Sequence, residues 1–295
     1  MAALALLRRR SGLDPGALAA LRRIVGAPKF EVVPLKNLDD QAAFLPAGAL
    51  VSVTASPAKG IEATIEASAR LRARGLTVVP HLSAHTIRDR AHLAELMKRM
   101  AEARLDRAFV VGGDADDRGD FHDGLSLLRA IREMDHPLRE IGVPCYPQGH
   151  PSIPDPVLLQ ALADKAPLAD YMTTQMCFDA DAIASWLRAR RADGIALPAV
   201  IGVPGVAEPH KLLSIATRIG VSDTRRFMTK NARFVARMVR SGGFYKPDGL
   251  LESLAPLMAD ASASVQGIHI YTFNAVEACE VWRTRYLTDL EARAS

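Results

Sequence analysis

The 295-residue chain contains few cysteines, little net charge and no long apolar run. Its three cysteines, Cys145, Cys177 and Cys279, lie far apart without CxxC spacing, which argues against a disulfide framework and fits a reducing cytoplasm. No stretch reaches the roughly twenty apolar residues that cross a bilayer. The net charge of +4 is small for this length, so nucleic-acid binding is not expected. The sequence therefore predicts a cytoplasmic protein without membrane or nucleic-acid partners, and it leaves a homo-oligomer open.

Short apolar runs alternate along the chain with amphipathic segments, within a composition that is 49% hydrophobic and 24% charged. Alternation of this kind is the pattern of βαβ units. Three of the intervening segments, Ile61–Arg74, Arg88–Arg104 and Ala180–Arg191, carry apolar residues at helical spacing. The strands that the apolar runs predict are Phe30–Val33, Leu50–Thr54, Thr77–Pro80, Ala108–Val111, Ile141–Tyr146, Tyr171–Gln175, Pro198–Val203 and Ile268–Thr272.

A closed parallel barrel accounts best for this order of elements. Most predicted strands are spaced by roughly thirty residues, enough for a strand, a helix and two loops, and eight such units predict a single (β/α)8 TIM barrel. An open doubly wound sheet is the alternative, but no GxGxxG motif follows the first strand. We expect an N-terminal helical extension over residues 1–28, with a helix at Asp14–Val25, and a catalytic barrel over residues 29–295. Extra helices at Asp223–Ser241 and Leu250–Ala263 are expected between strands seven and eight.

The predicted strand ends are unusually polar. In a (β/α)8 barrel the active site is built at the C-terminal ends of the strands. Burying many polar groups there without a function would cost on the order of 1 kcal/mol or more each. Any one of them alone could be an ordinary solvated strand end, but together they predict a functional site. The polar residues at these ends are Glu31, Thr54, His81, Asp114, Tyr146, His150, Gln175, Tyr271 and Asn274.

Seven motifs, in order along the chain from Phe30 onward, resemble those of the methylenetetrahydrofolate reductase family. The motifs are Phe30-Glu31-Val32-Val33-Pro34, Ser52-Val53-Thr54, His81-Leu82-Ser83, Gly113-Asp114, Tyr146-Pro147-Gln148-Gly149-His150-Pro151, Thr174-Gln175-Met176-Cys177-Phe178-Asp179 and His269-Ile270-Tyr271-Thr272-Phe273-Asn274. The resemblance implies reduction of 5,10-methylenetetrahydrofolate to 5-methyltetrahydrofolate. It also implies FAD as a bound cofactor and NADH or NADPH, written NAD(P)H, as the electron donor.

The resemblance also implies residue roles. Glu31 matches the glutamate that acts as general acid, and a carboxyl group in apolar surroundings keeps its proton near neutrality because desolvation raises its pKa. Asp114 matches the aspartate between flavin and pterin, and Gln175 matches the glutamine that offers a donor and an acceptor to the pterin edge. We therefore expect Glu31, Asp114 and Gln175 to form the catalytic and folate-binding set. The flavin contacts that the resemblance implies are Thr54, His81, Gly113, Asp114, Tyr146 and His150.

Two other patterns suggest ligands of a different kind. The acidic run Asp114–Asp120 resembles a calcium loop, but Arg118 takes a ligand position and no glutamate closes the loop. His81 and His85 lack the HExxH glutamate of a zinc site, so no metal is predicted. A basic helical face after strand seven is interpreted as a solvated stripe, with polyglutamate-tail binding as the alternative. Its residues are Arg226, Lys230, Arg233, Arg237 and Arg240.

The chain departs from the family where a flavin pyrophosphate needs cations. Gly112 replaces the family's arginine, although Lys165 and Asp155 could substitute for missing flavin contacts after a small shift. The family's phenylalanine after strand seven is also absent, and Glu208, Pro209 and His210 stand there. The helix expected to carry an aspartate and basic residues toward the flavin has Val157, Gln160, Ala163 and Asp164 instead. Two alternatives stay open, a flavin-independent folate reductase and a folate-binding paralogue without catalysis.

Overall fold

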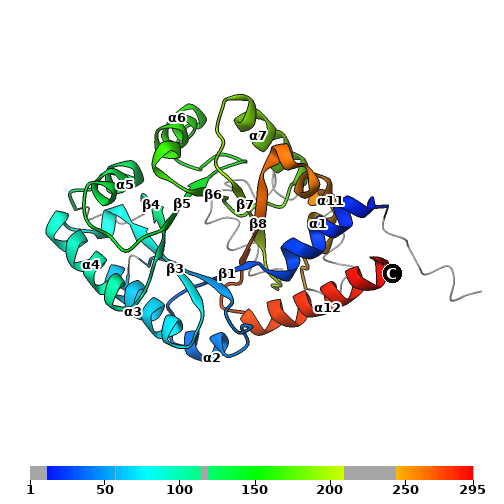
Figure 1. Ribbon diagram of the computed structural model, residues 1–295, viewed down its shortest axis with the longest axis horizontal. Helices are drawn as coiled ribbons and strands as arrows, with labels where there is room; N and C mark the ends of the chain where they lie inside the picture. Colours follow the sequence, from blue (N-terminus) through cyan, green and yellow to red (C-terminus); the bar gives the residue numbers. More distant parts are fainter. Residues whose placement is uncertain (1–11, 57, 114–118, 209–243, 295) are drawn as a thin grey trace, which may run out of the picture.

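The computed structural model describes residues 12–56, 58–113, 119–208 and 244–294, in which eight parallel strands close into a barrel (Figure 1). Each strand pairs with its neighbours in sequence order, and β8 pairs with β1 to close the ring. The predicted (β/α)8 barrel is confirmed, and the open sheet is excluded. The strands are β1 (Lys29–Val32), β2 (Leu50–Val53), β3 (Thr77–Ser83), β4 (Arg107–Val111), β5 (Glu140–Cys145), β6 (Tyr171–Thr174), β7 (Ala199–Pro204) and β8 (Val265–Tyr271).

Helices surround the barrel and follow the predicted amphipathic segments closely (Figure 1). The predicted helix Leu250–Ala263 is wrong at its end, because Asp260 accepts a hydrogen bond from Ser262 N and starts a separate 3-10 turn at Ala261–Ala263. The predicted helix at Asp223–Ser241 and its basic face lie outside the described residues. The described helices are α1 (Pro15–Gly26), α2 (Leu38–Ala42), α3 (Gly60–Ala73), α4 (Arg90–Glu102), α5 (Gly124–Arg132), α6 (Asp155–Lys165), α7 (Ala180–Ala192), α11 (Asp248–Ala259) and α12 (Val276–Ala294).

The N-terminal helix α1 packs beside the end of the chain, against α11 and α12 (Figure 1). Asp14 caps it by accepting a hydrogen bond from Ala17 N at 2.9 Å, and Pro15 occupies the first turn, where its missing N–H costs nothing. At the other end, Arg283 of α12 donates to the carbonyl oxygens of Val25 and Gly26. These contacts attach α1 to the same side of the barrel as the β1–β8 seam.

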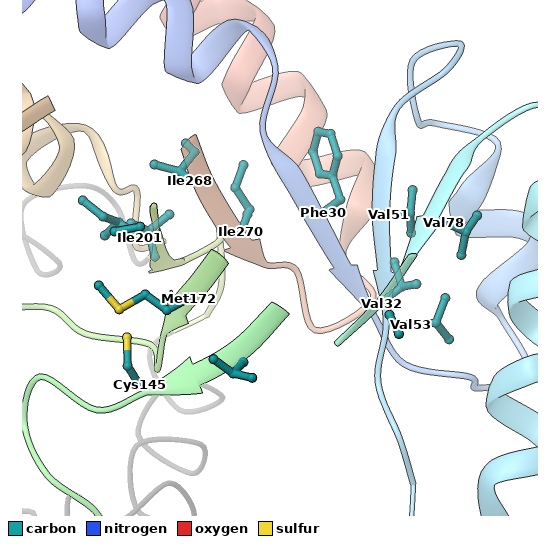
Figure 2. Packing of buried hydrophobic residues seen from close by; sticks show 14 of the residues in the cluster. Phe30, Val32, Val51, Val53, Val78, Cys145, Met172, Ile201, Ile268 and Ile270 are labelled. Atoms are coloured by element: carbon teal, nitrogen blue, oxygen red, sulfur yellow. The ribbon is translucent and has the colours of Figure 1, made fainter. Parts of the chain in front are cut away.

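The buried apolar side chains of the strands belong to two separate hydrophobic clusters. The larger cluster joins alternate strand residues to the helices, and Figure 2 shows its strand members Phe30, Val32, Val51, Val53, Val78, Cys145, Met172, Ile201, Ile268 and Ile270. The smaller cluster consists of Val79, Phe109, Tyr171 and Val200. Because successive side chains of a strand point to opposite faces, the smaller cluster lies inside the barrel with the intervening residues of each strand. No helix of the described residues has both the length and the apolar character of a membrane span.

Candidate functional site

Glu31 and His269 meet inside the barrel where β1 and β8 close it. Their strands are neighbours, and Glu31 Oε2 lies 2.9 Å from His269 Nε2. The Glu31 side chain is 14% exposed and that of His269 is 3% exposed, so the contact is shielded from bulk water. The two residues are 238 positions apart, and only barrel closure brings them together. Glu31 therefore sits at the strand end predicted for it, with an imidazole partner that the sequence analysis did not include.

Burial changes the acidity of the groups around this contact. Desolvation raises the pKa of Glu31 to about 7, with the charge of His81 opposing the shift. Desolvation lowers the pKa of His81 to about 4, and it lowers the pKa of His269 well below its usual value near 6.5. Near neutral pH both imidazoles are thus uncharged, while Glu31 can hold or release a proton. This is the behaviour expected of a general acid.

His81 reaches the same interior from β3, as predicted from its strand end. Its Nε2 lies 2.7 Å from the hydroxyl of Ser52 on β2, and its ring lies 4.8 Å from the ring of Phe109 on β4. His85 lies in the turn after β3, with Nε2 2.9 Å from the carbonyl oxygen of His122. The two histidines therefore have different surroundings. Within the described residues, no three His, Cys, Asp or Glu side chains gather to hold a metal ion.

The turn after β8 fixes the backbone that carries Glu31. The hydroxyl of Thr272 donates to the Glu31 carbonyl oxygen. Asn274 accepts from Val33 N at 2.7 Å and donates to Val33 O at 2.9 Å, so one amide side chain holds both backbone groups of that residue. Phe273 and Asn274 adopt φ of 51° and 58°, a left-handed turn that Asn tolerates better than most residues. Asn274 thus holds the backbone next to Glu31 through its hydrogen bonds to Val33.

The other predicted site residues lie at neighbouring strand ends. Gln175 follows β6 and accepts a hydrogen bond from Met176 N at 2.8 Å, while Tyr146 and His150 follow β5 with their rings 5.3 Å apart and edge to face. Thr54 follows β2, where its carbonyl accepts from Thr64 at 3.1 Å. Asp114 lies outside the described residues.

Gly113, at the end of β4, needs to be glycine. Its φ is +99°, and a Cβ added there would come within 2.1 Å of Ser83 Oγ on β3. The predicted glycine therefore keeps the loop after β4 close to the end of β3. This loop leads directly to Asp114.

A cavity of about 280 Å³ lies beside the site, between α6 and α7. The segment after β5 contributes Tyr146 and Gly149 to its wall, and α7 contributes Trp186 and Arg190. The Arg190 guanidinium is already paired with Asp193 at 2.6 Å and lies 5.4 Å from the Trp186 ring centroid. The cavity therefore borders the strand-end region through Tyr146, and its one arginine is engaged.

The interior residues that sequence reasoning missed are Lys29, Ser52, Tyr171 and His269. A signal for two of them was present, because side chains two residues apart on a strand share a face. Lys29 precedes Glu31 by two positions, and His269 precedes Tyr271 by two. Because residues i and i−2 of a strand share a face, the predicted strand ends at Glu31 and Tyr271 would have placed Lys29 and His269 in the interior as well.

The raised pKa of Glu31 leads to a stability prediction. Glu31 contributes to the free energy of unfolding in full below its ordinary pKa near 4.5. This stabilisation is lost as the pH rises through the folded-state pKa of about 7. Glutamine has no charge to bury. From pH 5 to pH 9 the free energy of unfolding of Glu31→Gln should therefore rise relative to the native protein, by up to about 3 kcal/mol.

Urea unfolding at the two pH values measures this difference. Glu95→Gln, at an exposed position of α4, is the matched control and should show no such change. If Glu31→Gln and the native protein differ in free energy of unfolding by the same amount at both pH values, burial does not raise the pKa of Glu31.

A family model described as methylenetetrahydrofolate reductase matches residues 26–282. A monomeric dihydrodipicolinate synthase variant is similar in structure, with 11% identity, a TM-score of 0.44, and 96% of this chain and 79% of that chain covered. The spore cortex-lytic enzyme SleL of Bacillus cereus is also similar, with 9% identity, a TM-score of 0.49, and 95% and 84% covered. Structural likenesses this weak carry no argument about function.

Proposed function

The chain belongs to the methylenetetrahydrofolate reductase family, a family of folate-related oxidoreductases, and on this premise we propose that it reduces 5,10-methylenetetrahydrofolate to 5-methyltetrahydrofolate. The observation that carries the proposal is Glu31, a carboxyl group buried at the mouth of the barrel with its pKa raised to about 7. The electron donor in this proposal is NAD(P)H. Folate and nicotinamide are thus the two substrates.

The proposed reaction needs an acid before it needs a hydride. In the substrate one methylene carbon bridges two nitrogens, and breaking one C–N bond gives an iminium at the pterin nitrogen. Glu31 supplies the proton that the leaving nitrogen takes up. Hydride from NAD(P)H then adds to the iminium carbon and gives the methyl group, so one hydride and one proton are consumed in each turnover. The Glu31 carboxylate regains its proton from solvent.

Gln175 and Asp114 are proposed to hold the pterin. The Gln175 carbonyl already accepts one bond from Met176 N, which orients the amide, and its N–H groups and second lone pair suit the donor and acceptor edge of the pterin. Asp114 follows Gly113, whose φ is +99°. Its proposed role is to accept hydrogen bonds from the pterin amino group. The role comes from the family resemblance, since Asp114 lies outside the described residues.

The family is generally flavin-linked, but the side chains of α6 offer a poor site for the pyrophosphate of FAD. On the face of α6 where the resemblance places flavin contacts, Val157 is 55% exposed, and Gln160 donates to Asp164 at 2.8 Å. An exposed carboxylate repels a pyrophosphate. The only basic residue of α6 is Lys165, which is partly buried near Cys145, where desolvation lowers its pKa.

These side chains of α6 favour the flavin-independent reaction, in which hydride passes directly from the nicotinamide to the folate. Pyrophosphate sites use cations or helix N-termini, and the α6 face offers a carboxylate and an apolar side chain instead. Direct transfer requires the nicotinamide and the folate to occupy the barrel mouth together. The proton from Glu31 is needed in the same way with or without flavin.

Absorbance and flavin titration distinguish the two schemes. We expect the purified protein to be colourless in the visible region, to leave added FAD unbound at high micromolar concentration, and still to form 5-methyltetrahydrofolate from NAD(P)H. A bound flavin spectrum, or folate reduction that starts only after FAD is added, would contradict direct transfer while leaving Glu31 as the acid.

A further inference from the structure

A lysine lies inside the barrel beneath the Glu31–His269 contact. Lys29 is 4% exposed, and it precedes Glu31 by two residues on the interior face of β1. Its Nζ lies 2.7 Å from the hydroxyl of Tyr171 on β6, and 4.0 Å from that ring's centroid. Barrel interiors are normally filled with branched apolar side chains, and an ammonium group taken out of water is costly. A lysine in this place therefore needs an explanation.

The fold makes room for the group that holds this lysine. Tyr171 occupies space next to Gly142 on β5, where an added Cβ would come within 2.2 Å of Tyr171 Cζ. Any side chain at position 142 would displace the tyrosine ring. Gly142, Tyr171 and Lys29 come from three strands, and the contacts among them hold the ammonium group inside the barrel.

Lys29 is paired in register with His269 on the adjacent strand. The Nε2 atom of His269 thus contacts Glu31, and Lys29 lies opposite His269 on the adjacent strand β1. Its other nitrogen, Nδ1, is buried and has no hydrogen-bond partner among the described groups. An imidazolium has two N–H donors, and here the one at Nδ1 would be buried without an acceptor. The neutral ring, with its proton on Nε2 and directed at Glu31, leaves only a lone pair unsatisfied.

Titratable side chains from several strands surround His269. Glu31 and Lys29 face it from β1, His81 from β3 and Tyr271 from its own strand. Below them, Arg107 of β4 pairs with Glu140 of β5 at 2.8 Å, and Tyr171 comes from β6. Strands β2 and β7 contribute no titratable side chain. Burial is the main cause of the lowered pKa values of His269 and His81, and the Lys29 charge lowers both further. Burial lowers the pKa of Lys29 itself to about 7, with Glu140 opposing, so Lys29 is charged in the pH range where Glu31 holds its proton.

We propose that Lys29, held by Tyr171, is a positioning residue that keeps His269 uncharged, so that the transferable proton stays on Glu31. A positive charge on His269 would stabilise the carboxylate form of Glu31, which cannot open the folate bridge. Lys29 acts through His269 and does not touch the folate. This inference rests on the proposed function, in which Glu31 is the acid.

The direct test observes His269 by NMR in the folded protein with labelled histidine, between pH 5 and pH 8. His269→Gln assigns the signal, and Lys98→Met, at an exposed position of α4, controls for loss of a lysine charge. In the native protein and the control we expect His269 to stay neutral throughout. In Lys29→Met we expect imidazolium to appear within this range. A His269 that stays neutral in Lys29→Met would overturn the inference.

The activity test uses a double variant. Removing the nearby charge in Lys29→Met should shift the alkaline fall of folate reduction to lower pH by roughly one unit, about fivefold in rate at pH 7. Lys29→Met/His269→Gln should regain the pH profile of His269→Gln alone, because glutamine cannot become positively charged. Failure to regain it would contradict the inference.

A second variant tests the inference if Lys29→Met does not fold, and the NMR measurement separates the inference from the proposed function. If Lys29→Met does not fold, Tyr171→Phe removes only the hydroxyl that holds the ammonium, and it should move His269 in the same direction by a smaller amount. An unchanged His269 signal in that variant would count against the inference. Absence of folate reduction in the native protein would refute the proposed function alone, since the NMR result does not depend on turnover.

Discussion

Glu31→Gln is expected to lower the rate of 5-methyltetrahydrofolate formation by at least about a hundredfold, the lower end of what general acid catalysis contributes. Glutamine keeps the shape of the side chain, and its amide can still face His269 Nε2, so the barrel mouth should keep its geometry. What the variant lacks is a proton for the leaving nitrogen. Because hydride can attack only the iminium, the loss should appear in kcat with less change in the KM for folate.

Steady-state kinetics of folate reduction measure this effect, with Glu95→Gln on the exposed face of α4 as the control. Binding of NAD(P)H, followed by its fluorescence, should survive in Glu31→Gln. Near-normal folate reduction by this variant would remove Glu31 from the mechanism and leave the fold as it is.

The second large effect is on the pH dependence of the same reaction. The acid form of Glu31 is present below its pKa of about 7 and is lost above it, because burial raises this pKa. The rate should therefore be level at mildly acidic pH and fall by about tenfold per pH unit on the alkaline side, reaching roughly a hundredfold loss at pH 9.

This profile distinguishes a buried acid from a solvated one. The residual rate of Glu31→Gln should show no such alkaline fall with this midpoint. A native rate that stays level to pH 9, or that falls with the ordinary midpoint of a solvated glutamate near 4.5, would contradict the account of Glu31 as a desolvated acid.

The strands were predictable because apolar runs that alternate with helical segments are compatible with few folds. Some of the predicted strand bounds were nevertheless wrong. The predicted third strand stops at Pro80, whereas β3 continues to Ser83, since Pro80 is the last residue paired with β2 and the following three residues pair with β4. The eighth strand starts three residues before the predicted Ile268. Exposed Gln266 and a register shift opposite Ala199 and Val200 obscure its alternation.

The candidate site was predictable in part for a related reason. Glu31 and His81 stand at the ends of apolar runs in recognisable motifs, and barrel topology turns strand ends into a site. The partnership of Glu31 with His269 depends on closure of β8 onto β1, and no local pattern records it. Lys29 was missed because a lysine at the start of a predicted strand is usually solvated, and only the closed barrel with Tyr171 across from it encloses the ammonium.

Mass spectrometry of the folate product, with the nicotinamide deuterated at the transferable position of C4, tests the central claim most directly. The native protein, mixed with 5,10-methylenetetrahydrofolate and deuterated NADH or NADPH without added flavin, should form 5-methyltetrahydrofolate that carries one deuterium in its methyl group. Glu31→Gln should form at least about a hundredfold less in the same time. No methylated product from the native protein, or equal amounts from both proteins, would contradict a folate reductase that uses Glu31 as its acid.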